Sequence, residues 1–204
     1  YPCTRVGEDF AQQRQLPVVR LQHHHAHLAA CLAEHLVPLD TAPVLGIILD
    51  GLGMGLHGEL WGGEILLGDY RSVERLGMLK PVALLGGERA MREPWRNTLA
   101  QLLSTMTWEN FLADYGHLEL AKSLKEKSIQ TYQSMIRLQK NAPLVSSAGR
   151  LFDAVAGAID LCRESVSFEG QAAMQLQGLA EKAIFDSEPD GFSYPLKIGV
   201  WPSN

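Results

Sequence analysis

The pattern of hydrophobic and polar residues along the chain predicts a small sheet flanked by many helices. Residues 44–50, VLGIILD, form a continuous apolar run between Pro43 and Gly51, which is typical of a buried central strand. Short mixed runs separated by glycines over 59–79 predict two further antiparallel strands. The apolar segment LPVVRLQ at 16–22 predicts an additional strand.

The remaining chain repeats polar and apolar residues at helical spacing. The predicted helices cover 7–15, 23–36, a segment that becomes helical near Glu88, two amphipathic helices within 108–140, and the segments 146–161 and 167–183. Pro94 is expected to start or kink a helix. The helix at 146–161 has an apolar face formed by Leu151, Phe152, Val155, Ala156 and Ile159. The tail, 185–204, is rich in turn residues and is expected to end in one short strand.

Composition narrows the class of protein. The chain has 204 residues, 46% hydrophobic and 20% charged, with a formal net charge of −5, and this is ordinary for a folded globular protein. There is no basic cluster, so nucleic-acid binding is not expected. No apolar run is long enough to span a membrane and no secretory signal opens the chain. Cys3, Cys31 and Cys162 are scattered without CxxC spacing, which favours a reducing cytoplasm over a disulfide framework.

Four of the seven histidines lie in the segment QHHHAH at 22–27. On a helix, positions i and i+4 share one face, and of these histidines His23 and His27 have that spacing. Asp50 is a candidate third ligand, because a lone unpaired carboxylate closing an apolar strand costs several kcal/mol unless something compensates it. Two imidazoles and a carboxylate suit zinc or iron. The alternative is a solvent-exposed histidine run and an aspartate that caps a turn, and the residues alone leave both open.

The segment GLGMGLHG at 51–58 follows Asp50 directly. Backbone N–H groups of its glycines, Gly51, Gly53 and Gly55, can approach a phosphate closely. A hairpin turn that needs positive φ is the alternative. Because strands flank the segment on both sides, it does not fit a dinucleotide fingerprint or a Walker loop.

Four longer blocks carry a resemblance to a known family. They are RLQHHHAHLAACLAEH, LDGLGMGLHGELWGGE, LLGGERAMREPWRNTLAQ and SSAGRLFDAVAGAIDLCRESVSFEGQAA, within residues 15–180. In order and separation they resemble the transferase module of the [NiFe]-hydrogenase maturation carbamoyltransferase HypF. That module is similar to the universal tRNA threonylcarbamoyl-adenosine synthesis protein, and both have the actin/Hsp70-like ATPase fold.

The resemblance implies an α/β fold: half of an actin/Hsp70-like (RNase H-like) ATPase, with a mixed sheet and a helical insertion. It also implies three regions: a metal- and phosphate-binding sheet subdomain at 1–87, a helical insertion at 88–145, and nucleotide-facing helices with the start of the truncated second half at 146–204. The family's second glycine-rich phosphate loop and its late Asp-Gly-Gly block are missing from the chain. The fold is therefore expected to be incomplete at the C-terminus.

The family's activity is implied in the same way. HypF makes carbamoyl-adenylate from carbamoyl phosphate and ATP in upstream modules, and transfers the carbamoyl group to the C-terminal cysteine of HypE. The resemblance implies that His23, His27 and Asp50 hold the metal beside ATP or carbamoyl-adenylate with magnesium. His24 and His25 are then expected on other helix faces. A catalytically incomplete fragment that binds metal and docks a partner through helices 88–140 is the alternative function.

Other site residues follow from the resemblance alone. The glycines matched to a phosphate-facing hairpin are Gly51, Gly53, Gly55, Gly62 and Gly63. Asp153 matches an acid near the nucleotide, where a carboxylate can accept both ribose hydroxyls. Glu169 lies in a matching block as a nucleotide-site candidate, with a helix N-terminal cap as the alternative.

Overall fold

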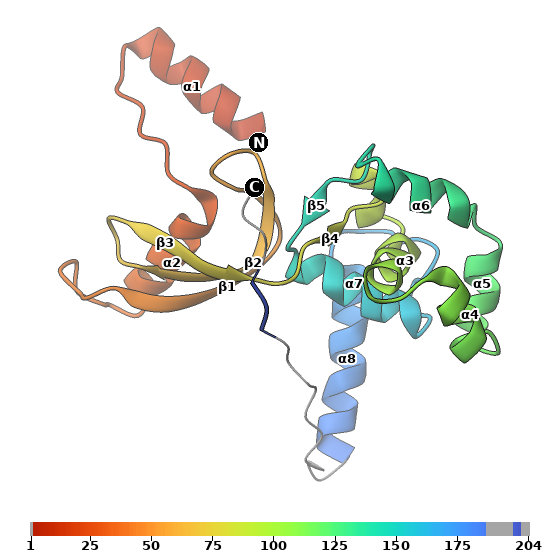
Figure 1. The fold of residues 1–204 in the computed structure, drawn as a ribbon. Helices are drawn as coiled ribbons and strands as arrows, with labels where there is room; N and C mark the ends of the chain where they lie inside the picture. The colour runs from red at the N-terminus through yellow and green to blue at the C-terminus, as the bar shows by residue number, and fades with distance from the viewer. Residues whose placement is uncertain (1, 187–197, 201–204) are drawn as a thin grey trace.

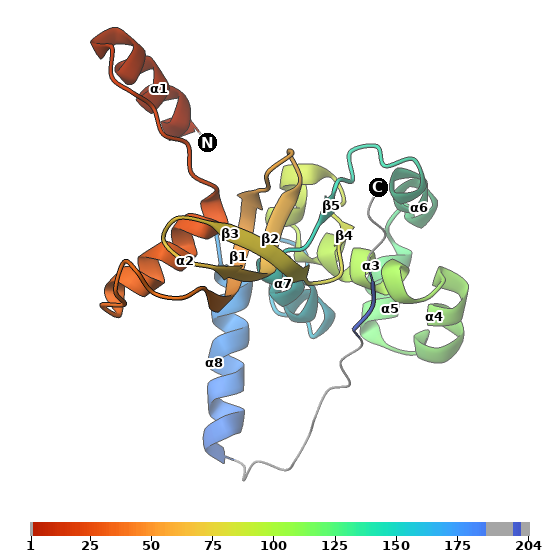
Figure 2. The ribbon, with the colours of Figure 1, turned by 60° about the vertical axis from the view of Figure 1, so that its left-hand side comes forward.

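The computed structural model describes residues 2–186 and 198–200 (Figure 1). Its elements, in chain order, are α1 (Pro2–Arg14), α2 (His23–Glu34), β1 (Val44–Met54), β2 (Leu60–Gly68), β3 (Val73–Met78), β4 (Val82–Ala83), the 3-10 helix η1 (Gly87–Met91), α3 (Pro94–Thr105), α4 (Trp108–Tyr115), α5 (Glu119–Lys125), α6 (Ile129–Arg137), β5 (Leu144–Val145), α7 (Ala148–Ala158) and α8 (Gln171–Asp186). Helix α1 stands clear of the central body in both views, whereas α8 begins against α7 and extends away from the body (Figures 1 and 2).

The strands form one mixed sheet. Its order is β1-β2-β5-β4, and β3 also pairs with β2. Strand β2 runs antiparallel to β1 and to β3, and parallel to β5. The predicted mixed α/β architecture is therefore confirmed, and so are the two antiparallel strands expected within 59–79.

Strand β1 lies at the edge of this sheet, so the prediction of a buried central strand at 44–50 is wrong. Helix α2 covers one face, where Leu28 packs so closely that a Cβ on Gly46 would lie 2.8 Å from it. Alternate residues of a strand face opposite sides. Leu45, Ile47 and Leu49 therefore face away from α2, and they are 62%, 69% and 61% exposed. The apolar run does form a strand, but within the described residues only one face of that strand is covered.

Two local predictions near this strand also need correction. Residues 51–54 continue β1 rather than turning, with a register shift between Leu49 and Gly53, and the turn follows around Gly58 at φ +91°. The segment 16–22 is not a strand. Its apolar residues include Val19, which is 81% exposed, and it pairs with no strand in the described part of the chain. Apolar residues form a strand only where a neighbouring strand accepts their backbone hydrogen bonds.

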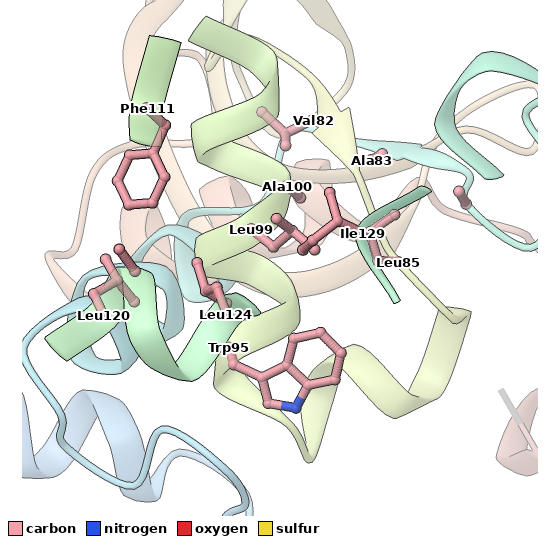
Figure 3. Packing of buried hydrophobic residues seen from close by; sticks show 12 residues of the cluster. Val82, Ala83, Leu85, Trp95, Leu99, Ala100, Phe111, Leu120, Leu124 and Ile129 are labelled. Atoms are coloured by element: carbon pink, nitrogen blue, oxygen red, sulfur yellow. The ribbon is translucent and has the colours of Figure 1, made fainter. Parts of the chain in front are cut away.

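The largest hydrophobic core lies in the helical region around α3 (Figure 3). Its buried members are Val82, Ala83, Leu85, Trp95, Leu99, Ala100, Phe111, Leu120, Ala121, Leu124, Ile129 and Ala142. The start of α3 at Pro94 agrees with the prediction. Residues 108–140 form three short helices, not the two predicted, because each brings a separate apolar anchor to this core: Phe111, Leu124 and Ile129.

Helix α7 buries a different face from the one its apolar residues predict. Leu151, Phe152, Val155 and Ile159 are 37–49% exposed, whereas the buried residues are Ala148, Asp153, Ala154, Ala156 and Gly157. The face of α7 that carries small residues lies close to the backbones of α3 and β1. A Cβ on Gly157 would lie 2.6 Å from Thr98 Oγ1 in α3, and one on Gly149 would lie 2.9 Å from the Cα of Gly51 in β1. Backbone proximity, not side-chain volume, decides which face is buried here.

The helices expected at 7–15, 23–36 and 167–183 correspond to α1, α2 and α8. Of the tail, residues 198–200 have no regular structure, and the rest of the predicted short strand lies outside the described residues. None of the helices in the described ranges is long and apolar enough to cross a lipid bilayer. The division at residues 87 and 145 stays a prediction.

Candidate metal centre

Helix α2 and strand β1 bring three potential metal ligands together. Gln22 caps the helix, since its side-chain oxygen accepts a hydrogen bond from the backbone N–H of His25 at 2.8 Å. The cap starts the helix at His23 and places His27 one turn later. The Nε2 atoms of these two histidines lie 3.2 Å apart, and Asp50 Oδ2 lies 2.9 Å from His23 Nε2 and 3.9 Å from His27 Nε2.

The backbone beside the three side chains holds them in place. Asp50 Oδ1 accepts the N–H of Gly51 at 2.6 Å, which leaves Oδ2 facing the histidines. Gly53 provides room for the rings, because a Cβ there would lie 2.5 Å from His23 Cδ2 and 2.5 Å from His24 Cε1. Gly53, three residues after Asp50, is therefore required by the histidine cluster itself.

The donor set fits a divalent ion. Candidate ligand atoms of His23, His27 and Asp50 all lie within 4.8 Å of one another. Ligands about 2.0–2.2 Å from a tetrahedral ion are separated by about 3.4 Å, and the three separations above bracket that value. Two neutral imidazoles and one carboxylate leave coordination positions for a substrate oxygen, as in catalytic zinc and non-haem iron sites.

His24 lies in the same cluster, although it was expected on another helix face. Its side chain is fully buried, and its Nε2 lies 3.6 Å from Asp50 Oδ2. Burial, and then the neighbouring His23, lower the pKa of His24, so the neutral imidazole is favoured. His25 does face elsewhere, as expected, and its Nε2 lies 2.7 Å from the carbonyl oxygen of Asp69. Spacing along an ideal helix missed His24, because its ring turns towards β1.

The backbone N–H groups of four of the five predicted phosphate-binding glycines donate to partners inside the chain. Gly51 N–H donates to Asp50, and Gly55 N–H donates to the carbonyl oxygen of Glu59 at 2.8 Å. The N–H groups of Gly62 and Gly63 donate to Glu64 Oε1 at 2.9 and 3.2 Å. Contact with a phosphate would require these groups to change partners, and the phosphate role stays a prediction.

Glu64 is a buried carboxylate that sequence reasoning missed. It is fully buried, and besides the two glycine N–H groups it accepts from Arg75 Nε at 2.6 Å and from Ser146 Oγ at 2.5 Å. The guanidinium of Arg75 also lies over the ring of Trp61, 4.1 Å from its centroid. The signal was present in GGEILLG, since an acid inside an apolar strand called for a partner there as it did at Asp50.

The remaining predicted residues lie outside the three-ligand group. Asp153 is buried on α7, with its Oδ2 2.9 Å from Arg150 Nε, and burial raises the pKa of its carboxyl group. Glu169 is exposed in the turn before α8. Helix α7 is nevertheless tied to the candidate metal centre, because the Ser147 hydroxyl donates to the carbonyl oxygen of Gly51.

A cavity of about 660 Å³ lies beside the cluster and is lined in part by His23. Its other walls come from α1, from the segment 18–22 and from Met54, Gly55 and Leu56. A molecule could therefore reach His23 from the side that α1 borders.

Comparisons with known proteins bear on the identity of this site. Residues 46–200 match the family described as "Carbamoyltransferase, Kae1-like Domain, second subdomain", and residues 1–34 match the "HypF Kae1-like domain". The carbamoyltransferase HypF of Rhodobacter capsulatus is 48% identical over 184 residues, which cover 88% of this chain and 23% of that protein. The probable carbamoyltransferase HypF of Methanocaldococcus jannaschii is 31% identical, over 89% of this chain and 23% of that protein.

Two solved structures are similar in fold. Full-length HypF in a phosphate- and nucleotide-bound form is 39% identical with a TM-score of 0.68, over 84% of this chain and 21% of that one. The HypF of T. kodakarensis is 28% identical with a TM-score of 0.76, over 97% of this chain and 25% of that one. The chain thus spans between a fifth and a quarter of the length of these four relatives. It belongs to the HypF carbamoyltransferase family, within the Kae1-like domain.

Proposed function

We propose that this chain carries the carbamoyl-transfer step of a HypF-type enzyme. The donor is carbamoyl-adenylate, made from carbamoyl phosphate and ATP, and the acceptor is the C-terminal cysteine of a HypE-type protein in [NiFe]-hydrogenase maturation in the cytoplasm. The observation that carries the proposal is the convergence of His23, His27 and Asp50 beside a cavity. Family membership supports it, as does the relative that is known in a phosphate- and nucleotide-bound form.

In this proposal His23, His27 and Asp50 hold zinc or iron. When bound, the ion supplies Lewis acidity that polarises a carbamoyl or phosphoryl oxygen. The chain's own contribution is to hold its ligands ready: Gln22 sets the start of α2, and Gly51 N–H orients the Asp50 carboxylate. The attacking thiolate belongs to the acceptor protein.

The nucleotide-binding part of the proposal involves α7, α8 and the glycine-rich strands. Asp153 would accept the ribose hydroxyls, Glu169 would lie near the nucleotide, and the glycine N–H groups would face its phosphates together with magnesium. The contact between Ser147 and Gly51 supports it, since it joins the helix of Asp153 to the strand of Asp50. The buried Asp153 carboxyl has a raised pKa, so binding ribose hydroxyls would supply hydrogen bonds that favour its charged form.

The metal site is tested by metal content. Wild type and the His23→Ala/His27→Ala double variant are purified without immobilised-metal resin and analysed by plasma mass spectrometry. His35→Ala/His117→Ala is the matched control, because it removes two exposed histidines outside the cluster. Near-stoichiometric zinc or iron is expected in wild type and in the control, and its absence from the site variant. Equal metal in all three proteins would reject the assigned ligands.

Transfer itself is tested by incubating the chain with carbamoyl-adenylate and a HypE-type acceptor. The expected result is a mass gain of one carbamoyl group at the acceptor's C-terminal cysteine, absent with the His23→Ala/His27→Ala variant. A second candidate function is a metal-binding and partner-docking unit without turnover, for which helices 88–140 are the predicted docking surface. The exposed apolar residues Leu45, Ile47 and Leu49 of β1 favour this function, although they lie outside those helices. Metal binding together with acceptor binding and no mass gain would favour this second function.

A further inference from the structure

The buried side chain of His24 has one satisfied and one unsatisfied ring nitrogen. Its Nδ1 lies 3.0 Å from the side-chain nitrogen of Gln22. Its Nε2 makes no hydrogen bond among the described residues and lies 3.6 Å from Asp50 Oδ2. A fully buried polar atom with no partner is uncommon and calls for an explanation.

The two ends of the Gln22 amide are identified by backbone groups whose roles are known. Its oxygen accepts from the N–H of His25 at 2.8 Å, so that end must be the carbonyl. Its nitrogen donates to the carbonyl oxygen of Met54 at 3.1 Å, so that end must be the NH₂ group. An amide nitrogen only donates. The atom that it meets on His24, Nδ1, must therefore be an acceptor without a proton.

A neutral imidazole with an unprotonated Nδ1 carries its proton on Nε2. In His24 the atom that carries this proton, Nε2, lies 3.6 Å from Asp50 Oδ2. A protonated ring nitrogen has no lone pair for an ion, which excludes His24 Nε2 as a fourth ligand in this tautomer. The ring is also held edge-on to His23, with the centroids 5.1 Å apart, and lies 5.5 Å from the centroid of Trp61.

We propose that His24 is a positioning residue for Asp50: Gln22 fixes its tautomer, and its Nε2–H serves the carboxylate rather than the ion. The inference rests on the proposed function in one respect, that Asp50 is a metal ligand. Without an ion, Asp50 Oδ2 lies within hydrogen-bond distance of His23 Nε2, at 2.9 Å. An ion held by His23 and His27 takes the lone pairs of their Nε2 atoms, so neither can donate to Asp50. His24 then provides the remaining ring N–H beside the carboxylate, and such contacts orient metal ligands.

The tautomer can be observed directly. The chain is labelled with ¹⁵N-histidine, and two-bond ¹⁵N–¹H spectra are recorded without metal and with Zn²⁺; the His24→Gln variant assigns the signals. His24 is expected to show a protonated Nε2 and an unprotonated Nδ1 in both states. In Gln22→Glu a carboxylate oxygen replaces the donor, so Nδ1 is expected to gain a proton. A protonated Nδ1 in wild type, or a His24 Nε2 that binds Zn²⁺, would overturn the inference.

The effect on the site is measured as Zn²⁺ affinity and as the absorption spectrum of the Co²⁺-loaded chain. His24→Leu removes the N–H group and is expected to lower affinity about 10- to 100-fold and to change the Co²⁺ spectrum. His24→Gln keeps an N–H at similar reach and is expected to retain most of the affinity and the wild-type spectrum. The matched control is His35→Leu, because His35 is an exposed histidine at the C-cap of the same helix, α2.

Two results would reject the positioning role: wild-type affinity in His24→Leu, or equal losses in His24→Leu and His24→Gln, which would indicate packing alone. A wild-type chain that binds neither Zn²⁺ nor Co²⁺ would instead reject the proposed metal site. In that case the spectra of the metal-free chain still decide the tautomer of His24. Its Nε2–H would then be a structural feature beside Asp50 with no role in metal binding.

Discussion

The helical region around α3 and the sheet region around α2 and β1 are built on opposite principles. In the helical region large apolar side chains are wholly buried, as at Leu99 and Leu124, which are both 0% exposed. In the sheet region two polar groups, His24 and Glu64, are 0% exposed, while Ile47 of β1 is 69% exposed. The first region gains its stability from apolar burial. In the second region, buried polar groups make contacts that hold candidate ligands in place.

The largest expected effect is on stability in the helical region. Leu99→Ala should lower the free energy of unfolding by about 2–5 kcal/mol, because it removes a fully buried side chain and leaves a cavity. Ile47→Ala, the matched change on the exposed face of β1, should cost less than about 1 kcal/mol. Urea unfolding followed by circular dichroism measures both. Equal losses would show that the face of β1 is covered in solution.

The next effect tests whether polar contacts stabilise the sheet region. Glu64→Gln removes a negative charge that contacts Arg75, Ser146 and two glycine N–H groups. The free energy of unfolding should fall by about 2–3 kcal/mol. This is less than the full value for a buried pair, because Arg75 is partly exposed. Glu119→Gln is the control, since that side chain is 78% exposed and pairs with Lys122 on the surface. A Glu64 variant as stable as the control would mean that the network contributes specificity without stability.

A smaller effect on stability, with a large effect on metal binding, is expected at Gly53. Gly53→Ala places a Cβ 2.5 Å from His23 Cδ2 and from His24 Cε1, so the rings must move, at a cost of about 1–2 kcal/mol. Zn²⁺ affinity measured by competition with a chelator should fall at least about tenfold. Gly51→Ala in the same strand meets nothing within 4 Å and should bind Zn²⁺ like wild type. The reverse order of affinities would argue against this packing of the histidines.

The smallest expected effect is the pH dependence that Asp153 contributes to the free energy of unfolding. Asp153 lies on α7, the helix that contacts both regions. Because burial raises the pKa of this carboxyl group, the native state keeps its proton to higher pH than the unfolded chain does. The stabilisation from that proton is present below the unfolded pKa, near 3.9, and is lost as pH rises through the folded pKa. Wild type should therefore lose stability relative to Asp153→Asn across this window. Urea titrations at several pH values measure the difference, and parallel curves would contradict it.

Residues close together in the chain gave the most reliable predictions. The spacing of His23 and His27 follows from helix geometry alone, and an acid closing the apolar run pointed to Asp50; the structure brings all three together. The same logic applied to Glu64 would have found this buried carboxylate as well. What failed were statements about neighbours: β1 is not central, 16–22 pairs with no strand among the described residues, and α7 turns its small residues inward.

The sequence by itself determined the type of most elements, the family resemblance and the three candidate ligands. Helix and strand periods and capping side chains depend on residues only a few positions apart, and a resemblance depends on residue order. Only the tertiary structure decided which faces are covered, that His24 turns towards Asp50, and that the glycine N–H groups already have partners. These features depend on the backbone of a distant segment approaching within a few ångströms. Hydrophobicity along the chain records that a residue favours burial, but not which neighbour will bury it.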